Sequence, residues 1–136
     1  MGVPFYLVAS ATKLILAQRM VRKICQNCKK EVNLTREQVE GLGVPPDILR
    51  NIRAFKGMGC SDCSNTGMTG RTAIFEVMPI TSRIEKAILM KESDDIIRKT
   101  AIEDGLYSLR MSAIDKMKQG LVSIDEVYAN TAPVIT

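Results

Sequence analysis

The chain has no histidine and no tryptophan, and aromatic residues make up only 4% of its 136 residues. Without an imidazole there is no histidine-based triad and no histidine general base. Aromatic side chains for base stacking are also too few to support binding of single-stranded nucleic acid, so we expect no nucleic-acid partner. The adjacent acids Asp94-Asp95 and Glu103-Asp104 fall on expected helices, where consecutive side chains point in different directions. The sequence therefore offers no catalytic constellation.

Long apolar runs are absent as well. No stretch approaches the roughly 20 apolar residues that a membrane-spanning helix needs, and Lys13 interrupts the early apolar segment. Met1 is followed by Gly, Val and Pro rather than by the basic region that opens a secretory signal. We therefore expect a cytoplasmic protein whose thiols stay reduced.

Charge is distributed unevenly along the chain. Residues 1–72 hold 11 basic and 5 acidic residues, a net charge of +6, whereas residues 73–136 hold 8 and 10, a net charge of −2. The basic excess includes a cluster of Arg19, Arg22, Lys23, Lys29 and Lys30. Three roles are compatible with this cluster: a solvated surface, a contact with a nucleotide or an acidic partner, and a contact with nucleic acid.

The four cysteines form two matched pairs, Cys25-x2-Cys28 and Cys60-x2-Cys63, separated by 31 residues. Two residues between thiolates let both sulfurs reach one ion from a single turn, and two such turns supply four tetrahedral ligands. We predict that all four cysteines ligate one metal ion. Four thiolates leave no open coordination position, so we expect a structural site, with zinc as the metal.

Other chemistries also use paired cysteines. A redox CxxC motif occurs singly in a βαβ context, which this sequence lacks. A rubredoxin-type iron site has a similar layout, but that fold is acidic and rich in aromatic residues, unlike this basic chain. Two alternatives stay open: a stand-alone zinc module that binds nucleic acid or another protein, and an electron-transfer iron protein.

Helical spacing of apolar residues dominates much of the chain. It predicts a helix over 5–24 that leads directly to the first cysteine pair. Capping signals predict a short helix from Thr35, with Gln38 as its capping-box partner, and a second short helix from Pro45-Pro46. The β-branched, apolar segment Arg71–Met78 is predicted to be a strand. Capping serines and stop glycines predict four further helices, at 82–91, 94–104, 109–119 and 124–129. Ser82 with Glu85 and Ser123 with Glu126 are capping-box pairs, and Ser93 and Ser108 are further candidate N-caps.

Together these elements predict an α+β fold that is mostly helical. We expect a tetracysteine zinc-binding subdomain at 20–78 and a C-terminal helical subdomain at 79–130, arranged as a bundle. The N-terminal helix would occupy 1–24, and residues 131–136 would form a frayed tail. Metal binding at such a site contributes about 10–16 kcal/mol, comparable to the stability of a whole domain.

Several short motifs follow one another in a specific order. Met1-Gly-Val-Pro-Phe5 precedes Ala17-Gln-Arg-Met-Val-Arg22, then the first cysteine pair, then Cys60-x2-Cys63-x2-Thr66-Gly67-x2-Gly70-Arg71-x3-Phe75-Glu76. This order resembles the C-terminal part of the hexameric secretion ATPases that drive type II secretion and type IV pilus assembly, and the resemblance covers essentially the whole chain. Two departures are Pro4 directly after Val3, where the family usually has one more residue, and Met68, where Tyr or Phe is common.

The resemblance implies a fragment of a motor. The family's Walker A loop, Walker B acid and histidine-containing motif are not found in this sequence, so the chain alone is not expected to hydrolyse ATP. ATP and Mg²⁺ would bind only in the full-length hexameric parent. Arg19 and Arg22 are implied as candidates for contacting nucleotide in the intact motor, with structural ion pairs as the alternative role.

The resemblance also implies partners. These are the remainder of the motor ATPase, neighbouring subunits, and the inner-membrane platform protein of the pilus or secretion machine. The implied location is cytoplasmic and peripheral to the inner membrane. In the isolated chain, an apolar face on residues 5–24 without its normal partner would favour dimerisation or swapping.

Overall fold

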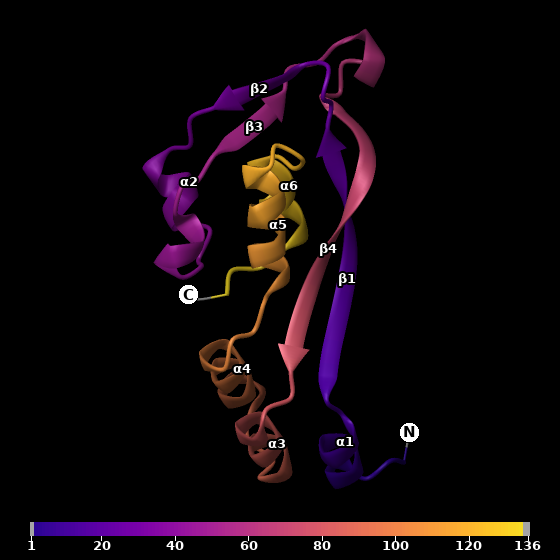
Figure 1. The fold of residues 1–136 in the computed structure, drawn as a ribbon, viewed down its shortest axis with the longest axis vertical. Helices are drawn as coiled ribbons and strands as arrows, with labels where there is room; N and C mark the ends of the chain where they lie inside the picture. The colour runs from indigo at the N-terminus through magenta and orange to yellow at the C-terminus, as the bar shows by residue number, and fades with distance from the viewer. Residues whose placement is uncertain (1, 135–136) are drawn as a thin grey trace. The chain divides into compact units, whose positions relative to one another are not determined.

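A computed structural model describes residues 2–134, in which the strands all precede the last four helices (Figure 1). The architecture is α+β, with six α-helices, two short 3-10 helices and four strands in the described residues. The elements in chain order are α1 (Phe5–Ala11), β1 (Leu14–Ile24), β2 (Lys29–Val32), α2 (Arg36–Glu40), η1 (Pro46–Leu49), β3 (Ala54–Gly57), η2 (Ser61–Cys63), β4 (Met68–Pro79), α3 (Ser82–Leu89), α4 (Asp94–Glu103), α5 (Leu109–Lys118) and α6 (Ile124–Asn130).

The described residues divide into two compact units. The first unit combines the chain up to Ala17 with Glu76–Ser108, and the second combines Gln18–Phe75 with the chain from Leu109 onward. Strands β1 and β4 are hydrogen-bonded neighbours in a two-stranded sheet, and the boundary between the units passes through both of them. No helix among residues 2–134 has the length and apolar character needed to cross a membrane.

The first unit is built around α3, which contacts both α1 and α4. Its core consists of Ile84, Ala101 and Leu106, against which partly buried isoleucines and Met78 pack. Thr81 and Ser93 cap α3 and α4, because each side-chain hydroxyl accepts a hydrogen bond from a backbone N–H in the first turn.

The second unit contains the antiparallel ribbon β2–β3 and the helices α5 and α6, which lie side by side (Figure 1). In the ribbon, Val32 stands opposite Ala54, whose side chain is buried. The largest fully buried side chains of this unit come from four elements and two loops: Val21, Ile24, Leu42, Ile74, Ile114, Met117, Val122 and Val127. This core includes the residue next to the first cysteine, because Ile24 and Cys25 are consecutive and both buried.

The predicted helix over 5–24 is wrong beyond Ala11, because Leu14–Ile24 is a strand. The apolar residues that suggested one helical face, such as Leu14, Leu16 and Met20, are about half exposed. Only Val21 and Ile24 are buried along this strand. Pairing with β4 overrides the local helical pattern, as is common where a strand gains its stability from a neighbour.

The other expected elements are largely confirmed. The four C-terminal helices, the capping box of Thr35 with Gln38, and the strand ending at Pro79 are all present. Three differences stand out: Thr81 rather than Ser82 caps α3, β2 and β3 were not expected, and the helix from Pro46 is a single 3-10 turn.

The expected domain division stays a prediction. The helices predicted to form one bundle over 79–130 fall in different units, α3 and α4 in the first and α5 and α6 in the second, so the bundle is not confirmed. Part of the expected frayed tail packs on the protein, since Val134 is buried and its N–H donates to the carbonyl of Gly43. Residues 135–136 lie outside the described residues.

Candidate metal centre

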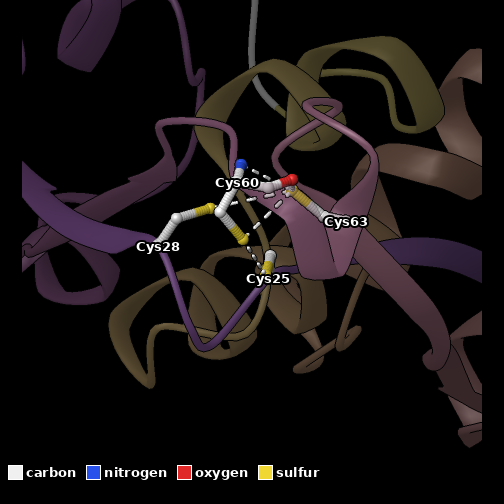
Figure 2. Close-up of side chains that lie close together, drawn as sticks. All are labelled: Cys25, Cys28, Cys60 and Cys63. Carbon is white, nitrogen blue, oxygen red and sulfur yellow. Dashed lines mark hydrogen bonds between the residues drawn. The ribbon is translucent and has the colours of Figure 1, made fainter.

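Two loops in the second unit carry the four cysteines. Cys25 follows the last residue of β1 and Cys28 precedes the first residue of β2, so both ends of this loop are held by strands. Cys60 directly precedes the short helix η2, and Cys63 is its last residue. This helix lies between β3 and β4 in the chain. Figure 2 shows the four side chains directed toward one another. The sulfur atoms all lie within 4.8 Å of each other, which is the arrangement that the spacing predicted.

The sulfur spacing fits a tetrahedral metal. The Sγ atoms of Cys25 and Cys60 are 3.7 Å apart, those of Cys28 and Cys63 are 3.8 Å apart, and those of Cys60 and Cys63 are 3.7 Å apart. Zinc–sulfur bonds of about 2.3 Å in a tetrahedron place neighbouring sulfurs about 3.8 Å apart. None of the four cysteines forms a disulfide. The residues present therefore fit a tetrathiolate ion, and an iron ion with similar bond lengths fits the same spacing.

Backbone amides surround the sulfurs. The Sγ of Cys63 accepts from the N–H of Cys60 at 3.3 Å and from that of Gly67 at 3.2 Å. The Sγ of Cys28 accepts from the N–H of Gly59 at 3.3 Å. Hydrogen bonds to the charged form of a thiol stabilise the thiolate, which is the form that binds a metal.

The pKa values of the thiols are pulled in opposite directions. Burial disfavours the Cys63 thiolate, but the backbone amides of Cys60 and Gly67, together with the thiols of Cys60 and Cys28, bring the pKa of Cys63 down to about 6. The side-chain amide of Asn27, followed by the backbone amide of Cys63, lowers the pKa of Cys60. Burial raises the pKa of Cys28 to about 11, only partly opposed by the amide of Gly59. A divalent cation among these sulfurs would favour deprotonation of all four.

A close backbone approach holds the two cysteine loops together. A Cβ atom built on Gly57 would lie 2.0 Å from the carbonyl oxygen of Gly67, so no larger residue fits at this position. The N–H of Cys25 donates to the same Gly67 carbonyl at 2.9 Å. Gly67 itself has a φ of +77°, which favours glycine. These contacts link the end of β1, the end of β3 and the start of β4 around the cysteines.

The two candidate nucleotide contacts, Arg19 and Arg22, both contact α6. The guanidinium of Arg22 forms an ion pair with Glu126, in which Nε at 3.1 Å and Nη2 at 2.9 Å donate to the same carboxylate oxygen. The backbone N–H of Arg22 donates to the other carboxylate oxygen of Glu126 at 3.0 Å. Arg19 donates to the carbonyl of Asn130 at the end of α6. Both arginines therefore tie β1 to α6.

Sequence reasoning overlooked the roles of Glu126 and Arg110. Glu126 was expected to be only the capping-box partner of Ser123, yet its carboxylate is buried against Arg22. Arg110 is 2% exposed and donates to the carbonyls of Leu42 and Thr131, with no carboxylate beside it among the described residues. Neither role has a local signal, because each partner lies far away along the chain.

A family model and several known proteins are similar to this chain over nearly its whole length. A family model described as "Type II/IV secretion system protein" matches residues 1–129. The chain is 39% identical to the type IV pilus assembly ATPase PilB of Myxococcus xanthus over 98% of its own length and 24% of that protein. It is 36% identical to PilB of Thermus thermophilus over 96% of its length and 15% of that protein. It is 31% identical to the type II secretion system protein E of Aeromonas hydrophila, over 96% of its length and 26% of that protein. The chain thus spans about a quarter or less of each of these relatives.

Proposed function

The chain belongs to the type II/IV secretion system protein family, and on that premise we propose that it is the zinc-binding C-terminal part of an ATPase for type IV pilus assembly or type II secretion. The observation that carries the proposal is the convergence of Cys25, Cys28, Cys60 and Cys63 on one point. Its role is structural and coupling: ATP and Mg²⁺ bind to another part of the parent protein, and this chain alone does not hydrolyse ATP.

The zinc ion would brace the strands that enter and leave the two loops. Cys25 and Cys28 join β1 to β2, and the second pair lies between β3 and β4. One ion on all four sulfurs would therefore fix four strand ends with about 10–16 kcal/mol of binding free energy. The helix α6 is tied to the same strand β1 through Glu126, so movement of β1 would be passed to α6.

An exposed apolar surface in the first unit supports the remainder of the motor ATPase as a partner. In α1 only Ala9 is buried, whereas Phe5, Tyr6, Leu7 and Val8 are 41–53% exposed. At the start of β1 three consecutive residues, Leu14, Ile15 and Leu16, are also 45–58% exposed. Lys13 is the only charged residue from Gly2 to Gln18. Soluble monomers rarely expose such continuous apolar surface unless a partner covers it.

We assign further partners and a location by the same proposal. Neighbouring subunits of a hexamer and the inner-membrane platform protein would contact the assembled motor, which would be cytoplasmic and peripheral to the inner membrane. No nucleic acid is expected. In the isolated chain, the apolar surface of α1 and β1 would favour dimerisation or swapping.

The nucleotide contact of Arg19 and Arg22 is retained as part of the proposal. In the intact motor a phosphate would have to compete with Glu126 for the Arg22 guanidinium and with the Asn130 carbonyl for that of Arg19. Arg22→Ala in the full-length motor is the test: weaker ATP affinity or turnover supports the contact. Unchanged affinity and turnover would leave Arg22 with only its structural ion pair.

Two measurements test the proposed function as a whole. Metal analysis of the purified chain should give one zinc per chain, and a protein with almost no bound metal, or a red ferric protein, would overturn the zinc assignment. Sequencing the DNA upstream of the Met1 codon should reveal an in-frame Walker A motif. An in-frame stop codon there would overturn the motor assignment and favour a stand-alone zinc module.

A further inference from the structure

Two lysines face each other in the ribbon beside the metal centre. Lys30 of β2 stands directly opposite Lys56 of β3. Both are exposed, and neither forms an ion pair with any described residue. Like charges directly opposite each other destabilise an antiparallel ribbon. Opposite charges do pair beside the ribbon, since Glu31 of β2 bonds to Arg53, the residue directly before β3.

No carboxylate among the described residues forms an ion pair with either lysine. Asp125 lines the same two cavities as Lys56, with volumes of about 190 and 230 Å³, but forms no ion pair with it. The adjacent Lys29 has partners within the chain, because its ammonium donates to Gln26 and lies 5.1 Å from the ring centroid of Phe55. Neither Lys30 nor Lys56 is thus paired with a carboxylate among the described side chains.

A loaded metal centre would supply the missing negative charge. Four thiolates around one divalent cation carry a net charge of −2, because four negative charges exceed the two positive ones. The segments 23–32 and 53–68, which hold the centre, contain five basic and two acidic residues, a net charge of +3. The charge of the protein here is therefore opposite in sign to that of the occupied site.

We propose that Lys30 and Lys56 are counter-charges for a dianionic metal–tetrathiolate at the four cysteines. They would raise metal affinity and destabilise the metal-free ribbon. Lys30 lies two residues after Cys28, which places their Cα atoms about 7 Å apart at a strand rise of about 3.3 Å per residue. The two loops are joined beside it, since the N–H of Met58 donates to the Cys28 carbonyl. At this range a single positive charge changes the affinity for a dianionic centre by about two- to fivefold at low salt.

This inference rests on the proposed metal site and deepens it. It accounts for a like-charge pair that costs stability in the empty protein and is offset when the ion binds. It also makes the contribution of the lysines electrostatic, so added salt should reduce it. An acidic protein segment bound across the two lysines is the competing explanation, and it predicts no effect on metal affinity.

The experiment compares the zinc affinity of three variants of the full chain with that of the original protein, by competition with a chromophoric chelator at about 20 mM and about 500 mM salt. Lys30→Gln/Lys56→Gln should weaken binding about 5- to 20-fold at the lower salt concentration and much less at the higher one. Lys56→Glu should weaken zinc binding further, while raising the urea midpoint of the metal-free chain because the introduced carboxylate would pair with Lys30. The control Lys99→Gln, on α4, should change nothing.

Cobalt spectra of each variant distinguish an effect of charge on affinity from a loss of the metal site. An unchanged tetrathiolate spectrum shows that the site is still formed, so an altered affinity reflects charge. Affinities within twofold of the original, or a loss that is equal at both salt concentrations, would overturn the role of the lysines. If the original protein binds neither zinc nor cobalt, the metal site itself fails, and that outcome is distinct from failure of the lysine proposal alone.

Discussion

Removing the Arg22 guanidinium should destabilise the second unit by leaving a buried carboxylate without its cation. Glu126 is 5% exposed, and it accepts two hydrogen bonds from the guanidinium, one from the Arg22 backbone and one from Asn130. Breaking a fully buried pair costs about 3–5 kcal/mol, whereas a surface pair is worth about 0–1 kcal/mol. The Arg22 side chain is 59% exposed, so water can replace part of its contact. We therefore expect Arg22→Met to cost about 2 kcal/mol, between these two limits.

Urea denaturation of the zinc-loaded chain at neutral pH measures this cost. The double variant Arg22→Met/Glu126→Gln should be less destabilised than Arg22→Met alone, because a neutral amide needs no cation. Arg36→Met is the matched control, since Arg36 forms an exposed i,i+4 pair with Glu40 and should cost less than about 0.5 kcal/mol. A loss below about 0.5 kcal/mol for Arg22→Met, or strictly additive effects in the double variant, would refute the assignment of this pair as a buried tie between β1 and α6.

Three further predictions concern other parts of the fold. Arg110→Met should cost about 2–4 kcal/mol in urea denaturation, because it leaves buried backbone carbonyls without donors; a loss under about 1 kcal/mol would show that water or rearrangement satisfies them. The Thr81 hydroxyl, followed by Arg83, lowers the pKa of Asp104 below its ordinary value of 3.8. The resulting stability is present above about pH 4 and is lost as pH falls through the lower, folded-state pKa, so melting curves of Asp104→Asn should lack part of this acid-dependent loss. Gly57→Ala should reduce the zinc content of the purified protein, because its Cβ collides with the backbone of Gly67; full zinc occupancy would contradict the close approach.

The sequence was most informative where a signal is local. The CxxC spacing placed two sulfurs on each turn, and the structure brings all four together. The capping box at Thr35 and the caps at Ser93 and Ser123 depend on groups within three residues, and all three form. The ordered motifs also indicate the family by residue type and spacing alone, and comparison confirms that membership.

The sequence was least informative where two distant segments decide the outcome. The residues of β1 carry a helical pattern, yet they pair with β4, which begins more than forty residues after β1 ends. Arg19 and Arg22 carried no local sign of their contacts with Asn130 and Glu126 of α6. Propensity is a weak preference of the order of 1 kcal/mol per residue or less, and strand pairing or a buried charge outweighs it.

What the sequence by itself determined is the two matched cysteine pairs, the helices with strong caps and the family, because each depends on residue type at fixed spacing. Only the tertiary structure decided that β1 is a strand, that Glu126 holds Arg22, and that Lys30 faces Lys56. These are consequences of packing and register, in which the partner of a residue is chosen by the fold. A sequence read position by position does not contain that choice.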